Sequence, residues 1–103
     1  MSVARIWRTT IDANRADEYE RFASEQSLPM FRRHDGFLGV VFAGTGSERV
    51  VITFWSSHEA IDALNRSPLY RETVERIEAT GFITGPASAE VFDIHDGSLD
   101  GLL

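Results

Sequence analysis

The apolar residues of the chain recur with two different periods. Residues 3–11, 37–43, 49–55 and 89–94 are rich in β-branched and aromatic side chains, which favour strands. Two further segments repeat their apolar residues every three or four positions, as amphipathic helices do. The pattern therefore predicts the element order βαββαβ. The helical stripes comprise Tyr19, Phe22, Ala23 and Gln26 in the first segment and Ile61, Leu64, Leu69, Thr73, Val74 and Ile77 in the second.

Polar and cyclic residues mark the limits of the first helix. Asn14 is the expected N-cap, because an asparagine side chain can accept from a free N–H of the first turn. Pro29 predicts a kink or a new short turn near Leu28, since proline lacks the N–H that a continuing helix requires. His34 falls at the C-terminal end, where the helix dipole favours a cation. We expect His34 to cap this helix rather than to act in catalysis.

The second helix is predicted to begin and to break at serines. Ser56 and Glu59 are three residues apart, which is the spacing of a capping box. Ser67-Pro68 interrupts the apolar pattern, since the residue before a proline avoids helical backbone angles. We expect a helix in two pieces that ends before Gly81.

This order is that of the ferredoxin-like α+β fold, with two helices on one face of an antiparallel sheet. In segment 49–55 both faces are mainly apolar, and helices can cover only one of them. Val50, Ile52 and Phe54 lie on the face expected to be bare. Stacking two copies is the simplest way to cover such a face. We predict a homodimer through the sheet faces, with one domain over residues 1–94 and a polar tail over 95–103.

The composition of the chain excludes several partners and several types of active-site chemistry. The chain has 103 residues and a net charge of -6, so a nucleic-acid partner is not expected. It has no cysteine and no lysine, which excludes thiolate, Cys-ligated metal and lysine Schiff-base chemistry. No two histidines have the spacing of a helical metal site, so no metal is predicted. No apolar stretch is long enough for a membrane span, and we expect a cytoplasmic location.

Several motifs together resemble the antibiotic biosynthesis monooxygenase family of dimeric α/β barrels, over roughly residues 3–94. The resemblance implies the ferredoxin-like fold, dimers, and a pocket between sheet and helices in each subunit. Some members of the family oxidise quinols or aromatic polyketides without a cofactor, others degrade haem, and many have no assigned reaction. The motifs are Val3-Ala4-Arg5-Ile6-Trp7-Arg8, Leu28-Pro29, Asp35-Gly36-Phe37-Leu38, Val51-Ile52-Thr53-Phe54-Trp55-Ser56-Ser57-His58-Glu59-Ala60, Arg66-Ser67-Pro68-Leu69-Tyr70 and Gly85-Pro86.

Position by position, the resemblance does not extend to the haem-degrading branch. Its iron-ligating histidine would fall at Val74, its ring-distorting tryptophan near Leu64 and its strand-one asparagine at Trp7. Valine cannot ligate iron, so we expect no haem. We expect no cofactor of another kind either, because the oxidising members that the chain resembles use none. The polyketide-oxidising branch would place an asparagine at Val51 and a tyrosine at Ile61, and neither is present.

The resemblance and the strand pattern together suggest a substrate pocket. We assign Trp55, Trp7, Phe22 and Arg71 to it as substrate-binding residues. An indole offers a flat surface and one donor to an aromatic ligand. The alternative for Trp55 is a packing role in the core, and the face of Trp7 is left open. Arg71 best matches the family's helix arginine, yet Arg71 could belong to a solvated helix face.

His58 is the candidate catalytic base. It falls in the first turn of the second helix, just after Trp55, where the positive helix end favours the neutral imidazole. Deprotonating a phenol or quinol requires such a group, although an exposed first-turn histidine often has no role. The leading hypothesis is a cofactor-independent monooxygenase-like protein that acts on or binds an aromatic or quinone-type molecule. The alternative is a non-catalytic dimeric ligand-binding or structural module.

Overall fold

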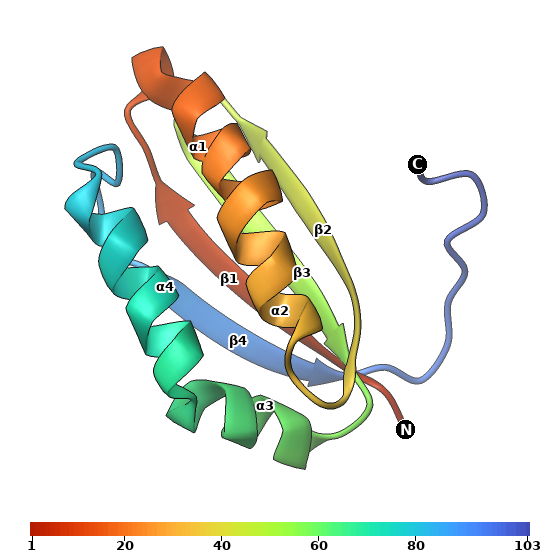
Figure 1. The fold of residues 1–103 in the computed structure, drawn as a ribbon. Helices are drawn as coiled ribbons and strands as arrows, with labels where there is room; N and C mark the ends of the chain where they lie inside the picture. The colour runs from red at the N-terminus through yellow and green to blue at the C-terminus, as the bar shows by residue number, and fades with distance from the viewer.

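The computed structural model describes all 103 residues and has the predicted element order. Its antiparallel sheet runs in the order β2-β3-β1-β4 (Figure 1), which is the ferredoxin-like α+β fold. Strands β2 and β3 form a hairpin whose two-residue loop begins at Gly46, with a φ of 56° that glycine adopts readily. The strands are β1 (Val3–Thr10), β2 (Phe37–Thr45), β3 (Glu48–Trp55) and β4 (Ser88–Asp93).

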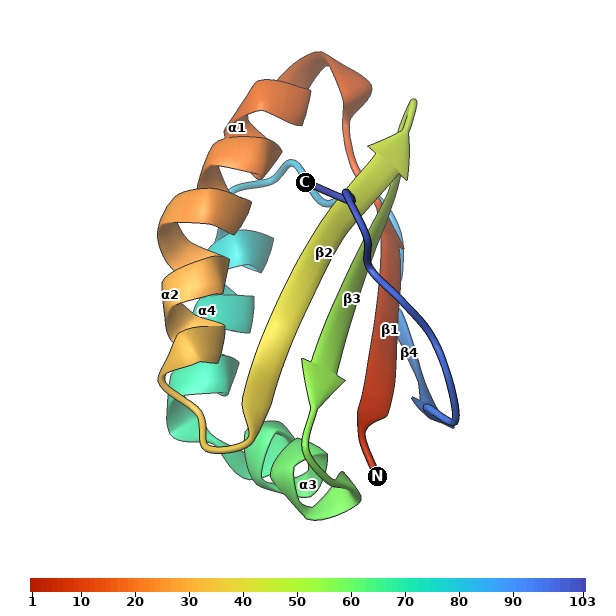
Figure 2. The same cartoon turned by 90° about the vertical axis from the view of Figure 1, so that its right-hand side faces the viewer.

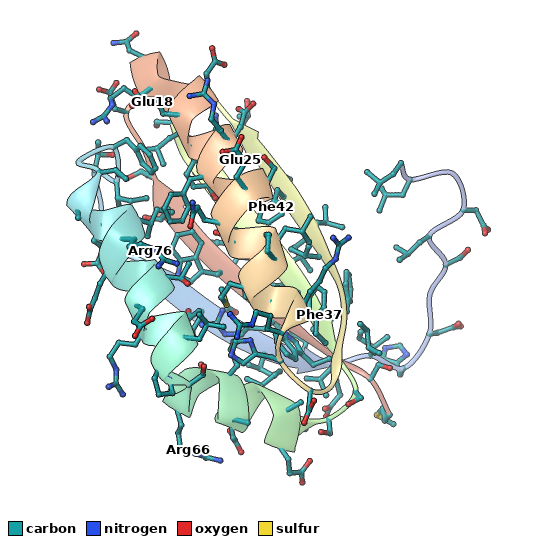
Figure 3. The ribbon with its side chains drawn as sticks, in the orientation of Figure 1. Glu18, Glu25, Phe37, Phe42, Arg66 and Arg76 are labelled. Atoms are coloured by element: carbon teal, nitrogen blue, oxygen red, sulfur yellow. The ribbon has the colours of Figure 1, made fainter.

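All helices lie on one side of the sheet, and the other side carries none (Figure 2). Charged side chains such as Glu18 and Arg66 are exposed on the outer side of the helices (Figure 3). The tail over residues 95–103 has no helix or strand and leads away from the end of β4. No helix has the length and hydrophobicity that crossing a membrane requires. The helical segments are η1 (Ala13–Arg15), α1 (Ala16–Phe22), η2 (Ala23–Ser27), α2 (Leu28–Arg32), α3 (His58–Arg66) and α4 (Pro68–Ala79).

The first helical region differs from its prediction in two places. Asp12, not Asn14, is the capping residue, because the Asp12 carboxylate accepts from the backbone N–H of Asn14 at 3.0 Å. The chain does restart a helical segment at Leu28, and a π-helical turn, η2, leads into it. There the N–H of Leu28 donates to the carbonyl of Ala23, five residues back. This wider turn accommodates Pro29 without breaking the helix.

Serines delimit α3 and α4. Ser57, not Ser56, caps α3 by accepting from the N–H of Ala60 at 3.2 Å. The third helical residue is thus an alanine, so the reciprocal glutamate bond of a capping box does not form. The predicted break at Ser67 is confirmed, and Ser67 both ends α3 and caps α4.

Strand register fixes which residues face the helices. Arg5 pairs with Thr53 and Trp7 with Val51, so these four side chains share the helix-covered face. Thr53 and Val51 are buried on this face, together with Trp55. The sequence left the face of Trp7 open, and the register assigns it to the helix side.

Candidate functional site

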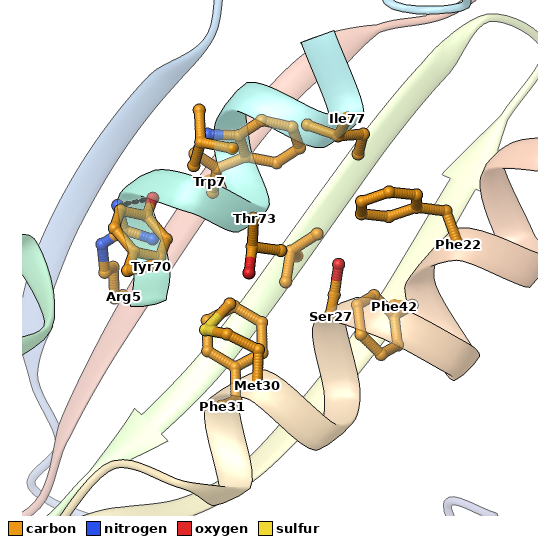
Figure 4. Close-up of a pocket in the computed structure, with 12 residues that line it drawn as sticks. Arg5, Trp7, Phe22, Ser27, Met30, Phe31, Phe42, Tyr70, Thr73 and Ile77 are labelled. Carbon is orange, nitrogen blue, oxygen red and sulfur yellow. Dashed lines mark hydrogen bonds between the residues drawn. The ribbon is translucent and has the colours of Figure 1, made fainter. Parts of the chain in front are cut away.

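A cavity lies between the sheet and the helices α1, α2 and α4 (Figure 4). Its free volume is about 50 Å³, it is partly open to solvent, and nine of its twelve lining residues are hydrophobic. Its walls combine aromatic rings with flexible or branched aliphatic side chains. The lining residues are Arg5, Trp7, Phe22, Ser27, Met30, Phe31, Phe42, Val51, Tyr70, Thr73, Val74 and Ile77.

Of the predicted substrate-binding residues, the structure places Trp7 and Phe22 on the cavity wall. Trp7 projects from β1 because of its register opposite Val51, and Phe22 projects from the end of α1. Figure 4 shows Phe22 and Phe42 on the same side of the cavity, away from Arg5 and Tyr70. These rings give a ligand flat apolar surfaces to pack against.

One end of the cavity is polar. Arg5 is only 6% exposed, and its Nη2 donates to the Tyr70 hydroxyl over 2.8 Å. The Arg5 guanidinium carbon also lies 5.4 Å from the centre of the Tyr70 ring. Arg5 forms no ion pair with any carboxylate of the chain. The cavity therefore contains a buried positive charge whose one hydrogen-bond partner in the protein is a neutral hydroxyl.

Hydrogen bonds between helices hold the cavity wall in position. The Ser67 hydroxyl accepts from the N–H of Tyr70 at 3.2 Å and lies 2.7 Å from Nε2 of His34. The other ring nitrogen of His34, Nδ1, lies 2.9 Å from the carbonyl of Met30. A carbonyl can only accept, so Nδ1 carries a proton. As predicted, His34 caps the end of the first helical region, and in doing so it connects two elements that line the cavity.

Trp55 does not line the cavity, contrary to expectation. Its side chain is 0% exposed, and its indole N–H donates to Thr53 Oγ1 over 2.7 Å. The rings of Phe31 and Phe37 pack edge-on against it, with centroids 6.3 and 5.5 Å away. These aromatic neighbours, supplied by α2 and β2, enclose the indole in the core. Trp55 can thus affect the cavity only indirectly, through core neighbours such as Phe31 that line it.

His58 and Arg71 also lie away from the cavity. The His58 ring is exposed and contacts the carboxylate of Asp93 over 2.5 Å, because the start of α3 lies beside the end of β4. Arg71 is exposed on the outer side of α4. Neither side chain lines the cavity, so the structure does not bring the predicted base to the predicted substrate pocket.

Tyr19 is buried outside the cavity, in a second core cluster. Its ring packs edge-on against Phe82, with centroids 5.9 Å apart. Burial raises the pKa of the Tyr19 phenol to about 12, against a smaller opposing effect of the Arg49 guanidinium. Tyr19 therefore stays protonated over the neutral range and serves packing. Nowhere in the chain do three or more His, Asp or Glu side chains form a group that could hold a metal ion.

Sequence reasoning missed the polar end of the cavity. Arg5 and Trp7 are two residues apart in a strand and therefore share a face. A charged residue on a covered face needs an explanation, so Arg5 could have been singled out from the sequence. Tyr70 carried no comparable signal, since it lies 65 residues from Arg5 in sequence. Only the packing of α4 against β1 brings the two together.

Comparison with known proteins is consistent with this geometry. The family model described as antibiotic biosynthesis monooxygenase matches residues 2–76. Among curated proteins, no match was found. A monooxygenase from the gene ActVA-Orf6 of Streptomyces coelicolor, solved with Nanaomycin D, has a TM-score of 0.82 at 17% identity, covering 97% of this chain and 93% of its own.

Two further structures are similar in fold. Rv0793 from Mycobacterium tuberculosis has a TM-score of 0.71 at 22% identity and covers 95% of this chain and 99% of its own. SnoaB, a cofactor-independent oxygenase from Streptomyces nogalater, has a TM-score of 0.68 at 19% identity, covering 93% and 95%. Identities this low establish the fold alone, whereas the family model spans most of the chain. This protein therefore belongs to the antibiotic biosynthesis monooxygenase family.

Proposed function

We propose that the protein binds a flat aromatic or quinone-type molecule in the cavity and acts as a cofactor-independent monooxygenase on it. The observation that carries the proposal is the cavity itself, with aromatic walls and one arginine at its polar end. Family membership supports the reaction type, as do the two Streptomyces oxygenases of the same fold.

The residues of the chain suit such a reaction in three ways. The apolar walls exclude water from a bound ring, and the aromatic side chains orient it by stacking. Oxygen reacts directly with an electron-rich phenolate or carbanion, so the protein must favour the ionised substrate. The Arg5 guanidinium is the charged group of the cavity that can do so.

The size of the cavity limits the ligand. Its free volume of about 50 Å³ is below the roughly 300–1,000 Å³ of typical ligand pockets. A single ring already requires wall residues to move, since a cavity known to take up benzene measures about 150 Å³, and a fused ring system requires a larger movement. Met30 can adapt in this way, because its side chain is unbranched and rotates readily.

The alternative function is a non-catalytic module that binds a ligand without turning it over. The small free volume and the absence of His58 from the cavity wall favour it. Oxygen uptake separates the two functions. If the protein is a monooxygenase, it should consume oxygen together with a quinol or anthrone faster than buffer alone does, and the oxidised product should accumulate. Binding without oxygen uptake would leave only the module.

We also propose that the protein forms a homodimer through the uncovered face of the sheet. Val50, Ile52 and Phe54 lie on this face and are only partly buried, while Phe92 on β4 is 49% exposed. An apolar sheet face without helices favours self-association, and stacking two copies would cover both faces at once.

A further inference from the structure

We infer that Arg5 and Tyr70 form an anion-recognition site, so that the ligand of the cavity binds as an aromatic anion with its ionised oxygen on these two side chains. The ligand class is a hydroxyaromatic compound bound as its phenolate or enolate. This inference rests on the proposed function and specifies the charge of the substrate.

The two buried arginines, Arg49 and Arg5, differ in their bonding partners, and this difference supports the inference. Arg49 is 8% exposed, and its guanidinium donates to the carbonyls of Gly46 and Glu48 and pairs with the Glu20 carboxylate over 3.5 Å. Arg5 is buried to a similar extent but has neither a carboxylate nor a carbonyl partner. A buried charge without a counter-charge is costly. An anionic ligand would supply the missing counter-charge.

The donors around Arg5 have the right arrangement. Arg5 Nη2 uses the Tyr70 hydroxyl oxygen as its acceptor, which leaves the hydroxyl proton of Tyr70 free to donate. Arg5 Nε and Nη1 make no hydrogen bond within the protein. Every fully enclosed side-chain nitrogen of the chain has a hydrogen-bond partner, so these two nitrogens are accessible to solvent or to a ligand. Figure 4 shows Arg5 and Tyr70 together at one end of the cavity, away from Phe22 and Phe42. An oxygen placed there can accept from both residues while its ring lies among the aromatic walls.

The chemistry follows from this placement. When the ligand ionises, its O–H bond breaks, the electron pair stays on oxygen, and the proton leaves to solvent. The guanidinium favours the charged form, because a nearby opposite charge lowers the pKa of an acid. The cavity can therefore generate a phenolate without a histidine base, which agrees with the position of His58 outside it.

Two ligands of matched shape test the inference. para-Nitrophenol ionises near neutral pH and becomes yellow, whereas its methyl ether, para-nitroanisole, carries no charge. We expect wild-type protein to bind the phenolate more tightly than the ether and to lower the apparent pKa of the bound phenol. An adjacent opposite charge typically produces a shift of about one to three units. The readout is the yellow absorbance across a pH series with protein in excess.

Variants assign the effect to residues. Arg5→Gln should abolish the shift and the preference for the phenolate while keeping binding of the ether. Arg5→Lys should retain part of the preference, and Tyr70→Phe should reduce it. Arg66→Gln removes an exposed charge on α3 and should change nothing. Circular dichroism checks that each variant is folded. If Arg5→Gln does not fold, the wild-type titration and the Tyr70→Phe variant still test the inference.

The two ways of failing are distinct. If the ether binds as tightly as the phenolate and the bound phenol titrates as it does in water, the inference is wrong while the proposed pocket stands. If neither compound binds, both the inference and the proposed function are overturned.

Discussion

Nε2 of His34 lies 2.7 Å from Oγ of Ser67, and this contact joins the end of α2 to the start of α4. His34 also bonds to the carbonyl of Met30, and Ser67 accepts from the N–H of Tyr70. Met30 and Tyr70 both line the cavity. The hydrogen bonds of one imidazole and one hydroxyl therefore connect the two helices, α2 and α4, that supply these lining residues.

Removal of the serine should weaken both the fold and the site. Ser67→Ala removes the N-cap of α4 and leaves His34 Nε2 without its partner. We expect a loss of about 1–2 kcal/mol in the free energy of unfolding. Ligand affinity should fall too, because Tyr70 is in the first turn of α4. Urea denaturation measures the first effect, and Ser56→Ala, at a serine that caps no helix, is the matched control.

Replacement of Trp55 should change stability more than binding. Trp55→Phe keeps most of the buried volume but leaves a gap beside Phe31 and removes the donor to Thr53. We expect a destabilisation of about 1–3 kcal/mol and a ligand affinity within roughly threefold of wild type, a factor worth less than 1 kcal/mol. A much larger loss of affinity in the folded variant would show that Trp55 contributes directly to the binding site.

Stability should fall steeply at alkaline pH. The pKa of Tyr19 is raised to about 12 in the folded chain against about 10 when unfolded. Below pH 10 both states keep the proton, and the contribution of Tyr19 to stability is fully present. Between about pH 10 and 12 the unfolded chain loses it first, so stability decreases by up to about 1.4 kcal/mol per pH unit.

Alkaline unfolding of wild type and Tyr19→Phe tests this assignment. The chain has no lysine or cysteine and only two tyrosines, so few other groups titrate in this range. The variant should show a flatter stability profile above pH 10. An unchanged slope in the variant would refute the assignment.

The proposed dimer makes its own prediction. Phe54→Asp puts a carboxylate on the uncovered face, where a stacked partner would leave it buried and unpaired. We expect wild type to sediment as a dimer at micromolar concentration and the variant to dissociate. Arg66→Gln, away from the sheet, should remain dimeric. A folded wild-type monomer at that concentration would exclude this interface.

The alternation of apolar residues in the strands, and the serines and prolines that interrupt the helices, predicted the architecture well. Alternation in 49–55 correctly assigned Val51 and Trp55 to one face, because pleating alone dictates it. The π-helical turn before Pro29 was not predictable, since it is one of several ways to accommodate a proline. The site was predicted less well. Trp7 and Phe22 line the cavity, but only the strand register decides the face of Trp7. The burial of Trp55 depends on how Phe31 and Phe37 pack around it.

The central claim is that an aromatic ligand occupies the cavity between sheet and helices. In a Trp55→Phe background, Trp7 is the only tryptophan and lies on the cavity wall. para-Nitrophenol should quench its fluorescence in a saturable manner. Val74→Phe, which fills the cavity from α4, should abolish the quenching while the protein stays folded. Saturable quenching that persists unchanged in the filled variant would place the ligand elsewhere and contradict the claim.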